Sequence, residues 1–103
     1  MGKTVEMTEE RVVKPGKDIV ASMAADFRRD LLNEVASGVK RLVVDLNGVE
    51  MVDSVGIGVL VAAYNSLSKN GGHMAVSNVS SDIYNLFKTM RLDQHFEVTP
   101  AAG

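Results

Sequence analysis

The chain has 103 residues, of which 46% are hydrophobic and 23% charged, and its formal net charge is −2. This length and composition predict one globular domain with one hydrophobic core. The 11 lysines and arginines are scattered along the chain, which argues against nucleic acid as a partner, and the absence of cysteine excludes a disulfide framework, a thiolate nucleophile and a cysteine-ligated zinc site.

The first segment, from Thr4 to Lys14, contains short β-branched stretches on either side of a polar T-E-E sequence. Such stretches predict two short strands or a hairpin. Pro15-Gly16 follows at once, and this pair is a turn signal that ends the strand region.

A change of apolar spacing at Ile19 marks the first helix. Apolar residues then recur at every fourth position: Met23, Phe27, Leu31 and Val35. This spacing predicts an amphipathic helix. Asp18 and Ser22 are its candidate N-caps, and Gly38 is the expected stop signal.

The rest of the chain alternates between strand and helix signals. Arg41–Leu46 is dense in aliphatic and β-branched residues and predicts a buried central strand. A helix is predicted for 56–69, a strand for 73–77, a third helix around 83–90 and a short last strand at 96–98. This order predicts an α/β fold with some parallel pairing, in which a mixed β-sheet of four to five strands packs against three or more helices.

The stretch Val52–Leu60, V-D-S-V-G-I-G-V-L, begins the second helix with two glycines. Each glycine costs roughly 1 kcal/mol relative to alanine in a helix interior. Asp53 or Ser54 is expected to cap this helix by accepting hydrogen bonds from the free N–H groups of its first turn. Capping does not explain Gly56 or Gly58, so the glycines indicate a further role for the helix start.

The second face of this helix is apolar as well. It carries Val55, Gly58, Val59, Ala62 and Ala63. A helix that is apolar all round is either buried on both sides or offers one side to a partner, and burying every face is difficult in a chain this short. We therefore expect a partner-binding face with Ser54 at its edge, where the two glycines let another backbone come close.

Signals for catalysis around Ser54 are weak. A nucleophile elbow needs a glycine two residues before the serine, where this chain has Val52. Gly56-x-Gly58 is a broken dinucleotide-binding fingerprint, because Val61 occupies the third glycine position. The sequence therefore predicts no enzyme, although a small hydrolase that uses Ser54 is a rival hypothesis.

The two histidines, His73 and His95, have no convergent partners in the sequence and are expected in surface or turn positions. No catalytic residue, cofactor or metal ligand is predicted. Since no apolar run approaches the roughly 18 residues of a membrane span, we expect a cytoplasmic protein without direct membrane insertion.

Ser54 is also a candidate phosphorylation site. A phosphate there would place about −1.5 to −2 charges at a helix N-terminus, where the helix dipole and free N–H groups tolerate an anion. The same phosphate would lie beside Asp53 and against an apolar docking surface, where its desolvation is costly. Phosphorylation would then switch partner binding off without unfolding the domain.

Four segments carry a recognisable pattern: R-L-V-V-D-L, V-D-S-V-G-I-G-V-L, G-G-H-M-A-V-S-N and I-Y-N-L-F-K-T-M-R-L-D-Q-H-F. Together they resemble the STAS domain family, named for sulfate transporters and anti-sigma factor antagonists, and most closely its stand-alone bacterial anti-anti-sigma members. The resemblance runs from about Lys40 to Phe96. It implies a STAS-like sandwich, with residues 1–103 as a single STAS domain and with 1–3 and 100–103 as expected flexible ends.

In that family the serine directly after the aspartate is phosphorylated by an anti-sigma factor that is also a serine kinase. The resemblance therefore implies that Ser54 is the acceptor, with Asp53 as its neighbour. It further implies that the unphosphorylated form binds the anti-sigma factor kinase and releases the sigma factor, and that a dedicated phosphatase restores this form. This is the partner switching of an anti-sigma factor antagonist, which regulates transcription.

Two positions depart from the family pattern. An acidic residue in the loop before the first helix helps to form the family's partner surface; Asp18 is the nearest candidate, but the usual spacing is shortened here to Gly16-Lys17-Asp18. Many members have a second serine or threonine after the acceptor, where this chain has Val55. The expected partner-binding residues are Asp18, Asp53, Ser54, Val55, Gly56, Gly58, Val59 and Ala62.

A second interpretation of the resemblance stays open. Some small STAS proteins look like accessory subunits of membrane transport complexes, in which the domain binds an ATPase. The chain would then be a non-enzymatic subunit of a signalling or transport complex, and Ser54 would not be regulated by phosphorylation.

Overall fold

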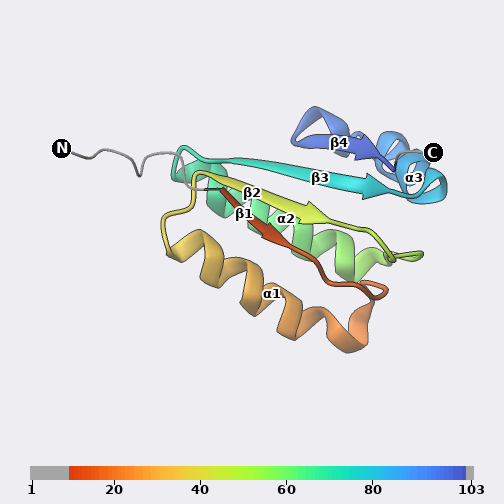
Figure 1. Cartoon of the computed structure of the whole chain (residues 1–103), viewed down its shortest axis with the longest axis horizontal. Helices are drawn as coiled ribbons and strands as arrows, with labels where there is room; N and C mark the ends of the chain where they lie inside the picture. Colours follow the sequence, from red (N-terminus) through yellow and green to blue (C-terminus); the bar gives the residue numbers. More distant parts are fainter. Residues whose placement is uncertain (1–9, 102–103) are drawn as a thin grey trace.

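The computed structural model describes residues 10–101. In this part of the chain, strands and helices alternate (Figure 1). The strands are β1 (Glu10–Val13), β2 (Arg41–Asp45), β3 (His73–Val79) and β4 (Glu97–Pro100). The helices are α1 (Ala21–Ala36), α2 (Ser54–Lys69) and α3 (Ser81–Thr89), followed by a short 3-10 helix, η2 (Leu92–Gln94). The predicted α/β class and the order of elements from α1 onward are confirmed.

The strands form one sheet in the order β1-β2-β3-β4. Every pairing between these four strands is parallel, and Arg41 of β2 pairs with both Glu10 of β1 and His73 of β3. Parallel neighbours need crossover connections, and here each crossover contains a helix. The sequence predicts a mixed sheet. The N-terminal segment for which it predicts two short strands or a hairpin, residues 4–14, lies partly on residues 1–9, outside the described residues. Within 10–101 the sheet is parallel throughout.

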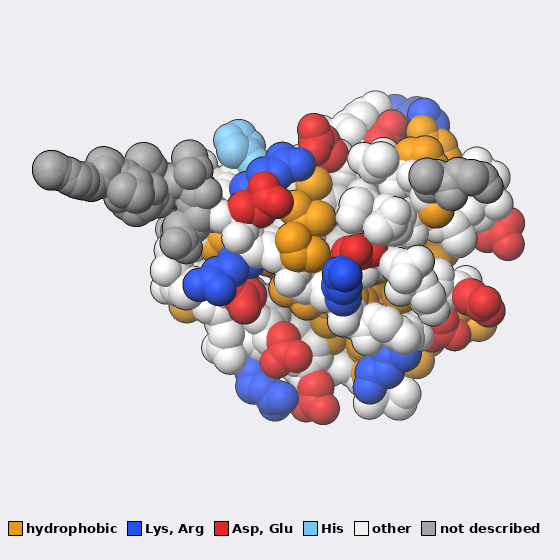
Figure 2. Space-filling view, in the orientation of Figure 1, with side chains coloured by type: hydrophobic (Ala, Val, Ile, Leu, Met, Phe, Trp, Pro, Cys, Tyr) orange, Lys and Arg blue, Asp and Glu red, His pale blue; other side chains and the backbone are white. Residues whose placement is uncertain are grey.

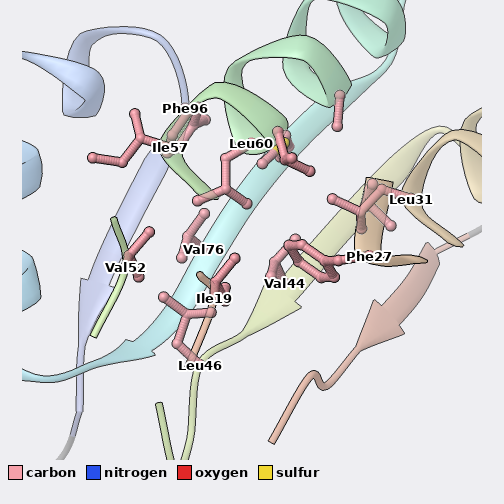
Figure 3. Packing of buried hydrophobic residues seen from close by; sticks show 14 of the residues in the cluster. Ile19, Phe27, Leu31, Val44, Leu46, Val52, Ile57, Leu60, Val76 and Phe96 are labelled. Carbon is pink, nitrogen blue, oxygen red and sulfur yellow. The ribbon is translucent and has the colours of Figure 1, made fainter. Parts of the chain in front are cut away.

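Helices α1 and α2 pack against each other, and their buried side chains join those of the sheet in one core (Figure 1). The side chains of β2 alternate, with Leu42 and Val44 buried and Arg41 exposed. Phe27 of α1 and Leu60 of α2 lie over the buried face of the sheet (Figure 3). This core holds the carboxyl ends of the strands and the starts of the helices in fixed positions.

The exposed end of β2 carries Arg41 between two carboxylates. The Arg41 Nε lies 3.4 Å from Glu10 Oε1, and its Nη2 lies 3.1 Å from Glu97 Oε1. Exposed ion pairs contribute about 0–1 kcal/mol each. Acidic and basic side chains are interspersed on the face shown in Figure 2, which carries no large patch of one charge.

Two loops at the carboxyl edge of the sheet lie side by side and position the start of α2. Ile19, in the loop before α1, forms an isolated parallel bridge with Val52, in the loop before α2. The Ile19 N–H donates to the Met51 carbonyl oxygen at 2.9 Å, and the Asp53 N–H donates to the Ile19 carbonyl oxygen at 3.1 Å. Because Ile19 and Val52 are both buried, the bridge anchors the two loops in the core (Figure 3).

Helix α1 begins without a cap from its own loop. Its N-cap residue is Val20, which makes no side-chain cap hydrogen bond, and its first turn contains no acidic residue. The prediction that Asp18 or Ser22 caps this helix is therefore wrong, because the Asp18 carboxylate binds the loop before α2 instead. The predicted stop is confirmed, since Gly38 follows the helix in a left-handed conformation with φ of +90°.

Asp45, the last residue of β2, connects β2 to its neighbours at this edge. Its Oδ1 accepts hydrogen bonds from Asn78 Nδ2 at 2.8 Å and from the Asn47 N–H at 2.9 Å. Its Oδ2 lies 4.0 Å from Lys14 Nζ. The hydrogen bond from Asn78, then that from Asn47, and more weakly the charge of Lys14, hold the pKa of Asp45 below its usual value, against an opposing effect of burial.

We expect Asp45 to contribute stability at neutral pH that is lost in acid. Because its folded-state pKa lies below the unfolded value of about 3.9, the contribution is complete above that pH and disappears as the pH falls through the folded-state pKa. Urea unfolding of wild type and Asp45→Asn is the measurement, at pH 7 and pH 2.5. The difference between the two proteins is expected to be larger at pH 7, and an equal difference at both pH values would contradict this role.

Candidate functional site

Ser54 lies where the loop after β2 enters α2. It is the first residue of α2 and is exposed to solvent. Two apolar side chains close to it in the chain are exposed as well: Met51 at 55% and Val55 at 46%. A hydroxyl group at a helix start, with exposed apolar neighbours, is accessible to another protein.

Asp53 caps two helices at once. Its Oδ1 accepts a hydrogen bond from the Gly56 N–H at 2.9 Å, in the first turn of α2. Its Oδ2 accepts one from the Ala21 N–H at 3.1 Å, at the start of α1. The predicted cap of α2 is confirmed, and Asp53 also supplies the carboxylate that the first turn of α1 lacks. The starts of both helices therefore converge beside Ser54.

Replacing Asp53 with alanine is expected to lower the free energy of unfolding by about 2 kcal/mol, since one helix cap is worth about 1 kcal/mol and two are lost. Ser80→Ala is the matched control, because the Ser80 hydroxyl caps α3 alone, through the Ile83 N–H at 3.3 Å. Urea unfolding of both variants provides the comparison. Equal losses in the two variants would show that Asp53 does not act as a shared cap.

Asp18 is placed by the structure between the same two loops. Its Oδ1 accepts hydrogen bonds from the Glu50 N–H at 2.9 Å and from the Met51 N–H at 3.1 Å. Asp18 is half-buried, and these two bonds hold the loop that leads to Ser54. The role that the structure shows for Asp18 is internal, and its expected contact with a partner stays a prediction.

The two glycines of the motif differ in their surroundings. A Cβ atom on Gly56 would lie 2.4 Å from the Ile19 carbonyl oxygen and 2.8 Å from Ile19 Cγ2, closer than atoms can approach. Gly56 is therefore needed inside the molecule, where α2 passes the loop before α1. A Cβ atom on Gly58 would meet nothing within 4 Å, and Gly58 is exposed. The fold gives a steric reason for Gly56 and none for Gly58.

The apolar second face of α2 is only partly exposed. Val59 is 6% exposed and Ala63 is 1% exposed, so the expectation that they face a partner is wrong. The reason is packing: α1 lies against α2, and both residues belong to the common core. Gly56 is buried too, so it does not let a partner's backbone approach. Three residues of this face are exposed or half-buried: Val55, Gly58 and Ala62. Together with the exposed residues Met51 and Ser54 they form what is here called the Ser54 surface.

Met51 is the residue of this surface that sequence reasoning missed. It lies between the Asn47-Gly48 turn and the V-D-S motif, and its neighbour Val52 turns into the core while Met51 points outward. The signal available in the sequence is a large apolar residue in a short connecting segment. That signal alone does not distinguish a buried anchor from an exposed contact residue.

The histidines lie at the other edge of the sheet from Ser54. His73 is the first residue of β3, and His95 follows η2. Both are exposed and line a cavity of about 600 Å³ together with Arg41 and Tyr64, and the His95 ring is 5.6 Å from the Tyr64 ring. Neither histidine is placed to take a proton from the Ser54 hydroxyl, so the arrangement offers no support for hydrolysis at this serine.

Among residues 10–101, no three histidine, aspartate or glutamate side chains gather in a group that could hold a metal ion. Nor does any helix in that range have the length and apolar character needed to cross a membrane. The site therefore offers a binding partner an accessible hydroxyl group, the starts of two helices and exposed apolar side chains.

Comparison with known proteins gives a consistent result. A family model described as STAS domain matches residues 3–102. An anti-sigma factor antagonist from Mycobacterium paratuberculosis is 26% identical; the match covers 95% of this chain and 81% of that one, with a TM-score of 0.80. The Bacillus cell fate determinant SpoIIAA in its phosphorylated form is 16% identical, with 92% and 86% of the two chains covered and a TM-score of 0.71. The STAS domain of a SulP transporter from Vibrio cholerae is 19% identical, with 95% and 77% covered and a TM-score of 0.72.

Proposed function

Because the chain belongs to the STAS domain family, we propose that it is an anti-sigma factor antagonist controlled by phosphorylation of Ser54. Its unphosphorylated form binds an anti-sigma factor that is also a serine kinase, and this binding frees the sigma factor. The kinase transfers the γ-phosphoryl group of ATP to the Ser54 hydroxyl, and the modified protein no longer binds. A phosphatase that removes this phosphate restores the binding form.

The observation that carries the proposal is the exposure of Ser54 within an apolar surface at a helix start. An exposed serine is accessible to a kinase, and the N-terminus of α2 tolerates the added negative charge. The neighbouring Met51 and Val55 would be covered in a complex. A phosphate at their edge would then have to lose its hydration, which opposes binding.

The structural neighbours support the same function. One of them is an anti-sigma factor antagonist, and another, SpoIIAA, has been solved in a phosphorylated form. Both match this chain over more than nine-tenths of its length. The likeness supports a protein partner and a phosphorylation switch, and Ser54 is the serine whose surroundings fit both.

Mass spectrometry tests the proposal. The protein is incubated with ATP and with an anti-sigma factor kinase from the same cells, or with lysate of those cells, and phosphate is then located in the chain. We expect one phosphate on Ser54 and none on a Ser54→Ala variant. Phosphate elsewhere, or none at all under conditions in which the kinase phosphorylates itself or another substrate, would contradict the proposal.

A second candidate function is an accessory subunit of a transport or signalling complex without regulation at Ser54. The likeness to a transporter STAS domain favours it. The two functions predict different behaviour of Ser54→Asp toward a co-purifying partner. An accessory subunit would keep its affinity in this variant, whereas an antagonist would lose it.

Gly58 provides a separate test of the Ser54 surface. Gly58→Leu is expected to weaken partner binding by tenfold or more and to change the free energy of unfolding by less than about 1 kcal/mol, because the added side chain points into open space. Affinity is measured with the co-purifying partner, and stability by urea unfolding. A loss of stability as large as the loss of binding free energy would show that Gly58 packs inside.

A further inference from the structure

Helix α1 depends for its N-terminal cap on a residue of the loop before α2. Val20 offers it no side-chain cap, and the carboxylate that binds the Ala21 N–H belongs to Asp53, 32 residues away in the chain. The same carboxylate binds the Gly56 N–H, only three residues from it. Asp53 is also the residue directly before Ser54. The Asp53 side chain thus links the starts of α1 and α2, in addition to the backbone hydrogen bonds that Ile19 makes to Met51 and Asp53.

The two bonds of Asp53 differ in how strongly they are fixed. The bond to Gly56 lies within one helical turn, so the backbone of α2 keeps donor and acceptor together. The bond to Ala21 joins two loops, which the backbone hydrogen bonds of Ile19 also hold together, and it requires the present orientation of the carboxylate. A rotation of the Asp53 side chain that keeps Oδ1 on the Gly56 N–H moves Oδ2 away from the Ala21 N–H.

A phosphate on Ser54 is a cause for such a rotation. It would place about −1.5 to −2 charges on the residue next to the Asp53 carboxylate. Two anions at one helix start repel each other, and both compete for the N–H groups of its first turn. The Asp53 carboxylate can then no longer keep the position that serves both helices.

We propose that Asp53 couples the phosphorylation state of Ser54 to helix α1: the phosphate displaces the Asp53 carboxylate from the Ala21 N–H, and the first turn of α1 opens. The switch would then have a second region, at Ala21–Ala25, in addition to the Ser54 surface. A partner that contacts both regions would be released by a change in shape as well as by charge. The inference rests on the proposed function only in taking Ser54 as the modified residue.

Amide hydrogen exchange measured by NMR tests this coupling without a kinase. The chain is assembled by chemical ligation with phosphoserine at position 54, and exchange of the amides of residues 21–25 is compared with that of the unmodified chain. We expect exchange about fivefold faster in the phosphorylated protein, the factor that corresponds to loss of one helix cap. Phosphoserine at Ser81 is the matched control, because Ser81 is also the first residue of its helix and its cap, Ser80, is local.

A second pair of proteins identifies the side chain responsible. In Asp53→Ser the residue can still cap α2 but is too short to bridge to α1, so exchange at the start of α1 is expected to be fast already. Phosphoserine at position 54 is then expected to cause no further change there. The proposal is overturned if phosphorylation leaves exchange in 21–25 unchanged in the wild-type background, or if its effect persists in Asp53→Ser.

These results are separable from those on the proposed function. The phosphate is introduced chemically, so the exchange measurement stands whether or not a cellular kinase acts on Ser54. Conversely, a kinase that phosphorylates Ser54 without any change in α1 would leave the proposed function in place and remove the coupling through Asp53.

Discussion

Replacing Gly56 with alanine is expected to lower the free energy of unfolding by about 3 kcal/mol, the upper part of the range for overpacking a core. The new Cβ atom would lie 2.4 Å from the Ile19 carbonyl oxygen. A backbone oxygen cannot rotate away as a side chain can. Ile19 is also fully buried and hydrogen-bonded on both sides, to Met51 and to Asp53, so relief of the clash must separate the two loops.

Gly58→Ala is the matched control for this prediction. The same substitution two residues later meets nothing within 4 Å and is expected to raise the free energy of unfolding by about 0.5–1 kcal/mol, because alanine favours the helix. Urea unfolding at neutral pH measures both variants. Similar changes in the two would show that the close approach of Gly56 to Ile19 does not limit stability.

Opposite outcomes at the two glycines would have a functional meaning. Gly56 would be explained by the fold, while Gly58 would be a position at which the chain carries a residue that costs stability and relieves no internal contact. Retaining glycine there is consistent with a partner that approaches the backbone of α2 closely. This is the reason for expecting Gly58→Leu to impair binding more than folding.

A negative charge at Ser54 is expected to lower the affinity for the partner by about a hundredfold or more, which corresponds to about 2.7 kcal/mol. The charge would have to be desolvated at the edge of an apolar contact, beside Met51 and Val55, whose side chains are 55% and 46% exposed in the free protein. Ser54→Asp provides the charge in part, and Ser54→Ala is expected to bind like wild type.

The same variants are expected to differ little in stability. Ser54 is exposed at the start of α2, where an acidic residue interacts favourably with the helix dipole. Because this gain offsets part of any loss of the Asp53 cap of α1, Ser54→Asp is expected to stay within about 1 kcal/mol of wild type. Ser81→Asp is the control for charge, since it makes the same change at the start of α3. A loss of binding in Ser81→Asp equal to that in Ser54→Asp would show that net charge, not the site, is responsible.

The fold could be predicted from the sequence because each helix and strand has a local sequence signal of its own. The four-residue apolar spacing predicted α1, the aliphatic run at Arg41–Leu46 predicted β2, and the acidic N-cap before the glycines predicted the start of α2. Turn residues such as Gly38 set the boundaries. These signals act over a few residues, and a single sequence contains them directly.

The arrangement of the site could be predicted only in part, because it depends on contacts between distant residues. The cap of α1 comes from Asp53, 32 residues beyond Ala21, and no local pattern reports such a bond. Composition could not tell that Val59 is covered by neighbouring elements while Val55 is exposed, since both are the same residue type on one helix. For the same reason the two glycines looked equivalent in the sequence and differ in the structure.

In the function we propose, the phosphorylation state of Ser54 decides whether the protein binds an anti-sigma factor. The direct measurement is a titration of the purified partner with unmodified protein and with protein carrying phosphate only on Ser54, at one salt concentration. We expect the unmodified protein to bind and the phosphorylated protein to bind at least about a hundredfold more weakly. Equal affinity of the two forms would contradict it.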